Sequence, residues 1–352
     1  MSLPRRQFAQ TLLAAAATTG LNATADAAAT AAPPALLRAR RLHPGDTLGL
    51  VSPANASFER EPVAIAIESL QALGFKVKTG VHLRARYGHF AGSDEQRAAD
   101  INAMFADDEV AGILALTGGS GCNRIVDRLD YGLIARKPKF FGGFSDLTCL
   151  VNAIQRQTGL ITFHAPFAGS EWNEFSVRQF KAMVMDGEAA LLRNPQGERG
   201  GQLVQTEDRI STLRGGRARG RLVGGNLAVL SSIAGSAYFP DCRGAILFLE
   251  EINEYIYRVD RMLSTLRLCG ALGQLAGVVL GKFSKCEPGD GNYGTLTLDE
   301  VFDDYLLPLQ VPVYRGAMIG HISRKFTVPV GAEVEIDADA GSIQLLAPAV
   351  RD

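Results

Sequence analysis

The feature that most constrains the fold is an alternation of apolar segments of strand length with amphipathic segments of helical spacing. Residues 47–51 and 112–116 are short apolar runs. Between them, residues 62–73 have helical spacing, and Ser93 with Gln96 forms a capping box for a second helix that runs to Phe105. Strands that alternate with helices predict an α/β fold, with a mostly parallel sheet covered on both faces.

The C-terminal part has a different pattern. Residues 334–337 and 342–346 flank a turn, which predicts an antiparallel hairpin and a second domain of mixed α+β type. The length suits two domains of ordinary size. We expect a nucleophile domain over 36–186, a polar and Gly-rich crossover between the domains over 187–217, and a C-terminal domain over 218–352.

The first 35 residues have the pattern of an export signal and linker. An Arg5-Arg6 pair precedes a short apolar run over residues 11–17, and two Ala-x-Ala sites follow. This pattern predicts a twin-arginine signal peptide cleaved before Asp26 or Ala28, and hence a periplasmic protein. The alternative is an Ala-rich tail with a chance Arg pair. The apolar run is too short to span a bilayer, so no stable membrane anchor is expected.

Composition excludes several classes of function. With 47% hydrophobic residues, 21% charged residues and a net charge of −1, the chain has the composition of a soluble globular protein. A nucleic-acid partner normally requires a basic surface, so none is expected. The five cysteines are scattered and form no C-x-x-C pair, which indicates neither zinc nor a redox dithiol. No metal or cofactor is predicted.

Residues 139–148 place a serine where a strand turns sharply into a helix. Phe140-Phe141 is typical of a buried strand end, Gly142-Gly143 allows an unusual turn, and helical spacing follows Ser145. A hydroxyl at such a turn is lifted from the sheet, and the free N–H groups of the helix start lie beside it. The pattern G-F-S-D differs from the G-x-S-x-G of α/β-hydrolases. The alternative is that Ser145 only caps the helix.

A Gly-rich loop follows the preceding strand, with Gly118, Gly119, Ser120 and Gly121 in its centre. Such a loop exposes backbone N–H groups that could hold a phosphate or an oxyanion. It matches neither G-x-G-x-x-G nor a Walker A loop, so a structural turn and a ligand loop both remain open. Because neighbouring crossovers of a parallel sheet open at one edge, we expect this loop to face Ser145.

An acid and a base can be added to this serine. Glu250-Glu251 follows the apolar strand 245–249, and His321 lies in a Gly-flanked turn after an apolar segment. Successive strand side chains point to opposite faces, so only one of the two glutamates can face the histidine. Nucleophile, acid and base are the three roles of a serine-hydrolase triad, which has no fixed order along the chain.

The chain resembles the LD-carboxypeptidases, the serine peptidase family of muramoyl-tetrapeptide carboxypeptidases and microcin-immunity peptidases. The motifs that carry the resemblance span residues 45–330 in the family's order. They are Gly118-Gly119 with Asn123-Arg124, the G-F-S-D turn, Phe163-His164-Ala165-Pro166, Gly225-Asn226-Leu227, Leu249-Glu250-Glu251, Tyr257 to Leu263, and Gly320-His321.

The resemblance implies a Rossmann- or flavodoxin-like parallel-sheet domain followed by a mixed α+β domain of the swivelling β/α type. It also implies roles for single residues. Ser145 would be the nucleophile, His321 the base and Glu250 the acid, with the backbone N–H groups of Gly119 and Asp146 as the oxyanion hole.

The substrate implied is a murein tetrapeptide cleaved before its terminal D-amino acid, with Gly118, Ser120 and Asn226 as candidate binding residues. Thr117 stands where the family usually has Arg, which bears on specificity. Family members are often dimers, so a homodimer is an expectation. Two alternatives lack turnover, namely a periplasmic solute-binding protein and an inactive relative that binds muropeptide.

Overall fold

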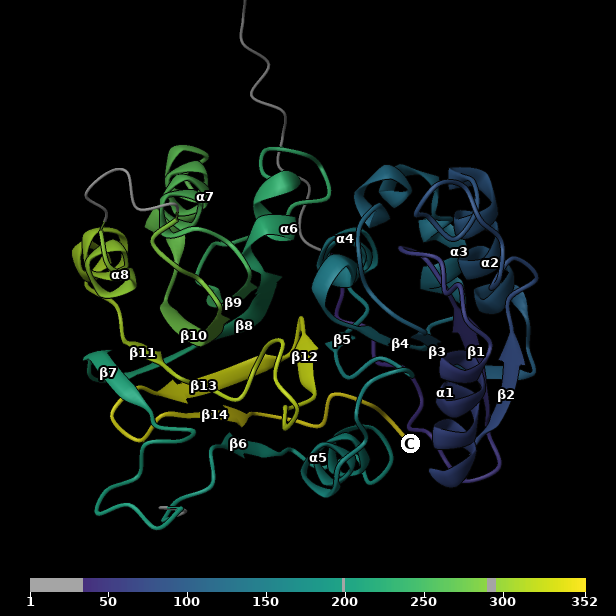
Figure 1. The fold of residues 1–352 in the computed structure, drawn as a ribbon, viewed down its shortest axis with the longest axis horizontal. Coiled ribbons are helices and arrows are strands. Elements are labelled where there is room, and N and C mark those ends of the chain that lie inside the picture. The colour runs from purple at the N-terminus through teal and green to yellow at the C-terminus, as the bar shows by residue number, and fades with distance from the viewer. Residues whose placement is uncertain (1–33, 198–199, 290–295) are drawn as a thin grey trace, which may run out of the picture. The chain divides into compact units, whose positions relative to one another are not determined.

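A computed structural model describes residues 34–197, 200–289 and 296–352 (Figure 1). Residues 34–352 form one unit. The predicted signal peptide lies outside the described residues, apart from the last two residues of its linker. In the described ranges, no helix is both long and apolar enough to cross a membrane.

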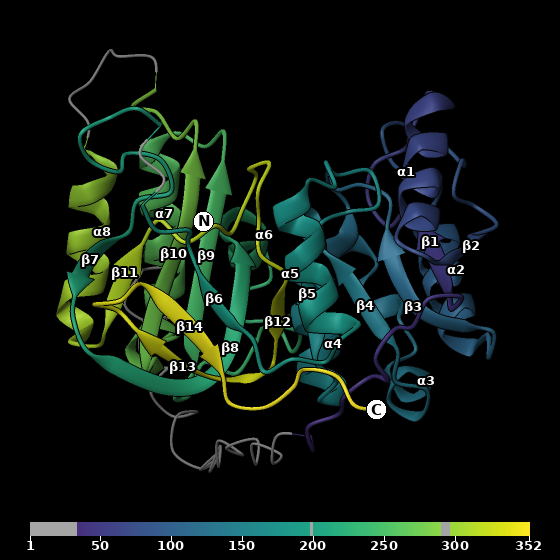
Figure 2. The same ribbon diagram turned by 90° about the horizontal axis from the view of Figure 1, so that it is seen from below.

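The first sheet has six strands in the order β12-β5-β4-β3-β1-β2 (Figure 2). Neighbours are parallel except for β12, which is antiparallel to β5. The strands are β1 (Thr47–Val51), β2 (Lys76–Thr79), β3 (Val110–Ala115), β4 (Phe140–Gly143), β5 (Thr162–His164) and β12 (Val328–Val330). Without β12 this is the flavodoxin-like strand order, which reverses direction between β1 and β3.

Five α-helices belong to this half of the chain: α1 (Glu61–Ala72), α2 (Asp94–Ala106), α3 (Tyr131–Arg136), α4 (Thr148–Thr158) and α5 (Glu174–Val184). The predicted capping box is present at the start of α2, where Ser93 and Gln96 bond reciprocally. Helix α4 ends at Gly159, whose φ of 76° is readily adopted only by glycine.

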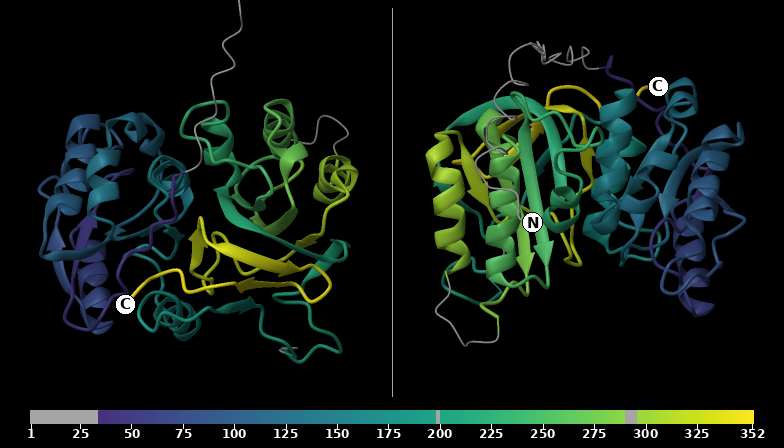
Figure 3. Two further views of the ribbon diagram at one scale, coloured as in Figure 1. Left: turned by 180° about the vertical axis from the view of Figure 1, so that it is seen from behind. Right: turned by 90° about the horizontal axis from the view of Figure 1, so that it is seen from above.

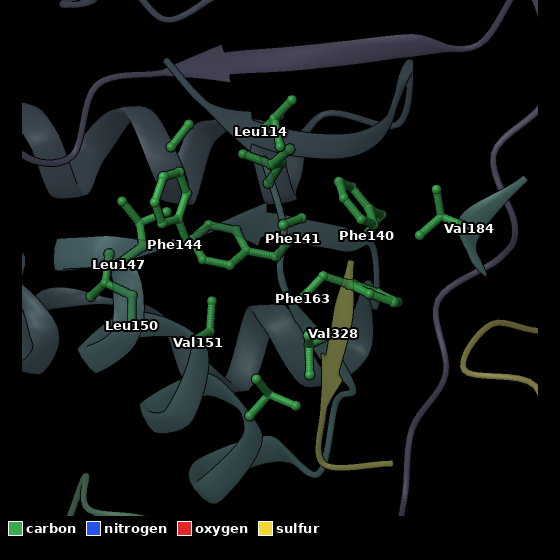
Figure 4. Close-up of a cluster of buried hydrophobic side chains, with 14 of the residues drawn as sticks. Leu114, Phe140, Phe141, Phe144, Leu147, Leu150, Val151, Phe163, Val184 and Val328 are labelled. Atoms are coloured by element: carbon green, nitrogen blue, oxygen red, sulfur yellow. The ribbon is translucent and has the colours of Figure 1, made fainter. Parts of the chain in front are cut away.

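The core of the first sheet surrounds β4, the strand that leads to Ser145. Phe140 and Phe141 point to opposite faces, as successive strand residues do (Figure 4). Phe140 packs on Phe163 with ring centroids 4.9 Å apart, whereas Phe141 lies on the side of Leu147 and Leu150. Both faces of the strand are therefore fixed by packing, which holds the turn that follows it in place.

The second sheet has eight strands in the order β6-β14-β13-β8-β9-β10-β11-β7. Its centre, β8 to β11, is parallel, and the remaining pairs are antiparallel. The strands are β6 (Leu191–Arg193), β7 (Ser211–Arg214), β8 (Arg217–Asn226), β9 (Ile246–Ile252), β10 (Gly277–Ser284), β11 (Val313–Arg315), β13 (Glu333–Asp337) and β14 (Ser342–Leu345).

Helices α6 (Leu227–Ser232), α7 (Ile256–Leu268) and α8 (Leu298–Leu306) cover one side of the central strands of this sheet. The β13–β14 hairpin lies on the other side of those strands (Figure 3). The described residues also contain five short 3₁₀ helices: η1 (Cys122–Arg124), η2 (Val126–Arg128), η3 (Ser145–Leu147), η4 (Leu272–Gln274) and η5 (Leu307–Leu309). The predicted hairpin of residues 334–346 is present, and the mixed α+β class of this half is confirmed.

In two places a strand does not belong to the sheet that its position in the sequence predicts. The segment 187–217, predicted as a crossover alone, contains β6 and β7, which form the two edges of the second sheet. The reverse exchange is made by β12, which comes from the C-terminal part and extends the first sheet. Each of these strands has only three or four residues. An apolar alternation this short gives no detectable period.

Candidate active site

The loops at the carboxyl ends of β1, β3 and β4 surround a cavity of about 620 Å³. Such a crevice, at the point where the strand order reverses, is where open α/β sheets bind ligands. The lining residues are Asn55 to Glu59, Pro62, Thr117 to Gly119, Phe144, Ser145, Phe167 and His321. The predicted nucleophile and base therefore share one cavity with the first part of the Gly-rich loop.

Ser145 begins η3 with a φ of 56°, in the left-handed region that non-glycine residues rarely adopt. This conformation costs about 1–3 kcal/mol and is typical of functional sites. The position before the helix belongs to Phe144, and no side chain caps the helix start. The capping alternative is therefore wrong, because the Ser145 hydroxyl bonds elsewhere: its Oγ lies 2.9 Å from Nε2 of His321.

His321 lies on a loop that is closed by a 2.9 Å hydrogen bond from Phe326 N–H to the Met318 carbonyl. Its Nδ1 lies 2.8 Å from Oε2 of Glu250. Since a carboxylate only accepts, we assign the proton to Nδ1, which leaves Nε2 to accept from the serine hydroxyl. Gly320 is required beside it, because a Cβ there would lie 2.9 Å from the Glu250 carboxylate.

Glu250 is fully buried, with 0% of its surface exposed. It lies near the end of β9, where it pairs with Asn226 of the parallel strand β8. One carboxylate oxygen binds His321, and the other has no hydrogen-bond partner in the described part of the chain. A buried carboxylate is costly unless compensated, so this glutamate is held in place for a purpose other than stability.

Glu251 points to the other face of β9 and has a structural role. Its carboxylate accepts hydrogen bonds from Asn226 Nδ2, Ala228 N–H and its own neighbour Ile252 N–H. Burial raises the pKa of Glu251 to about 7, against the effect of these donors. Glu251 is therefore buried at the start of α6, with 2% of its surface exposed.

The Gly-rich loop is fixed against the serine turn. A Cβ on Gly118 would lie 3.1 Å from that of Ser145, and one on Gly119 would collide with Asn55. Asn55 accepts a 3.1 Å hydrogen bond from Ser120 N–H, which ties the loop to the residues after β1. Backbone N–H groups of the loop are thus held beside the nucleophile.

Sequence reasoning missed two supports of this cavity. Arg97 of α2 is 1% exposed and donates from Nη1 to the carbonyls of Pro53 and Gly121, at 2.5 and 2.9 Å. It joins the loop after β1 to the Gly-rich loop. The wall formed by residues 55–62 was also missed. No motif marks it; the only available signal was the position of these residues directly after the strand that borders the reversal of the sheet.

The three predicted substrate-binding residues differ in position. Gly118 lines the cavity. Ser120 lies on its rim, where its hydroxyl is 3.3 Å from Nε2 of His89. Asn226 does not line the cavity; it caps α6 through Val229 N–H and donates to Glu251, which makes it structural and argues against a binding role.

Comparisons with known proteins identify the family of the chain. Residues 48–165 match the family model of the LD-carboxypeptidase N-terminal domain, and residues 219–336 match that of the C-terminal domain. The chain is 36% identical over 300 residues to the probable murein peptide carboxypeptidase of Bacillus subtilis, which covers 85% of this chain and 91% of that protein. It is 29% identical to the murein tetrapeptide carboxypeptidase of Pseudomonas aeruginosa, over 83% and 93% of the two chains.

Solved structures show the same fold. MccF in complex with glutamyl sulfamoyl guanosine is similar, with a TM-score of 0.80 and 26% identity, covering 90% of this chain and all of that one. The muramoyltetrapeptide carboxypeptidase from Oxalobacter formigenes has a TM-score of 0.70 and 28% identity, over 85% and 97% of the chains. Both halves of the sequence and the fold thus agree, and the chain belongs to the LD-carboxypeptidase family of serine-type peptidases.

Proposed function

We propose that this protein is a periplasmic carboxypeptidase that removes the terminal D-amino acid from murein tetrapeptides by cleaving the L,D amide bond. The observation that carries the proposal is the chain of two hydrogen bonds from Ser145 through His321 to the buried Glu250, at 2.9 and 2.8 Å. Ser145, at one end of these two hydrogen bonds, lines the cavity, where a peptide can reach it.

The acylation step follows from these positions. Ser145 Oγ attacks the carbonyl carbon of the scissile amide while His321 Nε2 takes its proton. Glu250 holds the imidazole in the required tautomer and stabilises the imidazolium. The tetrahedral intermediate then collapses, the C–N bond breaks, and the imidazolium gives its proton to the departing amine. The products are a free D-amino acid and an ester between the shortened peptide and Ser145.

Deacylation repeats the sequence with water. His321 takes a proton from a water molecule that attacks the ester carbonyl, and the proton then passes to Ser145 as the shortened peptide leaves. In both steps the negative charge on the carbonyl oxygen would be stabilised by the N–H groups of Gly119 and Asp146. Losing one such donor typically costs about 10²–10³ in rate.

The substrate class is supported by the relatives. Proteins similar to this chain over most of its length are named murein peptide and murein tetrapeptide carboxypeptidases. Another relative is named a microcin C7 self-immunity protein. The side chains that line the cavity in the described residues include a carboxylate, Glu59, and an exposed aromatic ring, Phe58, which suit a polar peptide.

The alternative is a periplasmic protein that binds solute or muropeptide without turnover. Mass spectrometry of a purified tetrapeptide incubated with the protein separates the two. A carboxypeptidase yields the tripeptide and a free D-amino acid, and leaves a diastereomer with a terminal L-amino acid intact. A binding protein yields neither product and does not react with a fluorophosphonate probe of activated serines.

A further inference from the structure

Lys325 is a buried cation close to the proposed triad. It lies on the loop that carries His321, and only 7% of its surface is exposed. Its ammonium lies 4.1 Å from the centroid of the Phe144 ring. The same ring packs on His321 with centroids 4.9 Å apart, so the ammonium and the imidazole contact one phenyl group.

The loop that places Lys325 is anchored on the start of α5. Lys325 N–H donates to Ser176 Oγ at 3.2 Å. Asn173, which caps α5, donates to the Ser323 carbonyl at 2.9 Å, and the Ser323 hydroxyl binds Glu171. The backbone of residues 323–325 is therefore held against the start of α5, and this fixes the position from which the buried Lys325 side chain extends.

The two other cations near this position face a different carboxylate. Arg324 and Lys282 both lie near Asp208, at 3.6 and 3.8 Å. Burial lowers the pKa of Lys325 to about 8, and the carboxylates of Glu250 and Glu171 oppose this effect. His164 also packs on Phe144, with ring centroids 5.7 Å apart, and burial lowers its pKa to about 3.

We propose that Lys325 is a positioning residue for the reaction, whose ammonium supplies the counter-charge of the buried Glu250 and so keeps His321 an effective base at neutral pH. The proposal rests on the proposed triad. Glu250 has one oxygen on His321 and one without a hydrogen-bond partner in the described residues. A lone buried carboxylate would hold a proton on the imidazole beside it, whereas a nearby ammonium opposes protonation of His321.

The sign of the effect can be worked out. Replacing Lys325 by methionine keeps most of the side-chain volume and removes the positive charge. The negative charge of Glu250 is then uncompensated, so the protonated form of His321 is favoured and its pKa rises. With the effective dielectric constant of about 20 that describes charge interactions in proteins, the expected rise is about one pH unit.

The test is an NMR titration of the His321 ring in the purified mature protein, with the signal assigned by its loss in His321→Gln. Lys325→Met is expected to raise the pKa of His321 by about one unit, and Lys325→Gln to do the same. Lys325→Arg, which keeps the charge, is expected to leave it near the native value. The matched control is Arg324→Met, which removes the neighbouring cation on the same loop.

An unchanged pKa of His321 in both neutral variants overturns the proposal, as does an equal rise in Arg324→Met. The titration needs no substrate, so its result stands even if the protein hydrolyses no murein peptide. Where hydrolysis is measured, the acid limb of the kcat/KM profile is expected to move to higher pH by the same amount in Lys325→Met. A merely structural lysine would change the melting temperature and leave that limb in place.

Discussion

The carboxylate of Asp146 accepts a 2.8 Å hydrogen bond from the backbone N–H of Cys122. One residue of the serine turn thus holds the Gly-rich loop by its side chain, while its own backbone N–H is a proposed oxyanion donor. The side chain is 5% exposed, and burial raises the pKa of Asp146. The relative position of the two proposed donors depends on this bond.

We predict that Asp146→Ala lowers kcat/KM for a murein tetrapeptide by about tenfold to a hundredfold, because a small displacement of a positioned donor costs that much. Asp146→Asn retains an acceptor oxygen and is the matched control, expected to keep most of the activity. Steady-state kinetics with both variants checks this. Equal activity of Asp146→Ala and the native protein would show that the loop is held by other contacts.

Ser145 provides a comparison between stability and activity. Both Ser145→Ala and Ser145→Gly are expected to abolish hydrolysis, because both remove the hydroxyl. They differ in backbone strain, since alanine keeps the unfavourable φ of 56° and glycine relieves it. We expect the glycine variant to be more stable than the alanine variant by about 1 kcal/mol, measured by denaturant unfolding. Substantial hydrolysis by either variant would exclude Ser145 as the nucleophile.

Glu250 and Glu251 are adjacent and are expected to fail differently. Glu250→Gln should lower turnover by about 10⁴, on the scale of the equivalent change in a serine protease, with the fold intact. Glu251→Gln should retain turnover but lose stability, because it replaces one of the two acceptor oxygens with an NH2 group that faces backbone or amide donors. Kinetics and thermal melting of the two variants test this together. The reverse assignment of effects would place the acid one residue later.

Glu251 also predicts a pH dependence of stability. Its pKa is raised to about 7 in the folded protein from an ordinary 4.5, so the folded state binds more protons between these values. The contribution of this group to the free energy of unfolding therefore falls as the pH rises from 4.5 to 7, by about 3 kcal/mol in total. The free energy of unfolding of the native protein and of Glu251→Gln can be measured with denaturant at several pH values. The difference between the two proteins isolates the pH dependence that comes from Glu251. A difference that stays constant with pH would contradict it.

The proposed location depends on the N-terminal sequence. We expect the exported protein to begin at Asp26 or Ala28 and to be recovered from the periplasm. N-terminal sequencing of the native protein checks the cleavage site. Replacing Arg5-Arg6 by Lys-Lys is expected to leave the uncleaved chain in the cytosol, since twin-arginine signals depend on that pair. Cleavage and export that persist after the change would point to another route.

Much of the fold could be read from the sequence because its main elements are long and periodic. The helix over residues 62–73 corresponds to α1 (Glu61–Ala72), and the apolar run 245–249 overlaps β9 (Ile246–Ile252). Strand β9 continues through Glu250 and Glu251. Because successive strand side chains point to opposite faces, the sequence alone predicts that the two carboxylates point in opposite directions. Ser145 was found because a Gly-Gly pair between a strand and a helix is a strong local signal.

The remaining features depend on contacts between distant parts of the chain. Arg97 was unremarkable in the sequence, yet it bonds carbonyls 44 and 24 residues away. Asn226 was predicted as a binding residue from the family resemblance, and nothing in the sequence indicated that its side chain binds the buried Glu251. Lys325 lies in a polar run that is typical of an exposed turn. Burial of a charge in such a run is decided by tertiary packing, and single-sequence patterns do not report it.

The strand β12 has a consequence for when the protein becomes active. Val328 begins this strand seven residues after His321, and it pairs with His164 at the open side of β5. The segment that completes the first sheet is thus the same segment that delivers the base. A nascent chain that has emerged only as far as the nucleophile has an unpaired strand edge and an unactivated serine. By the proposed mechanism the serine is activated only once this segment has been made, so the proposed site is assembled late in synthesis.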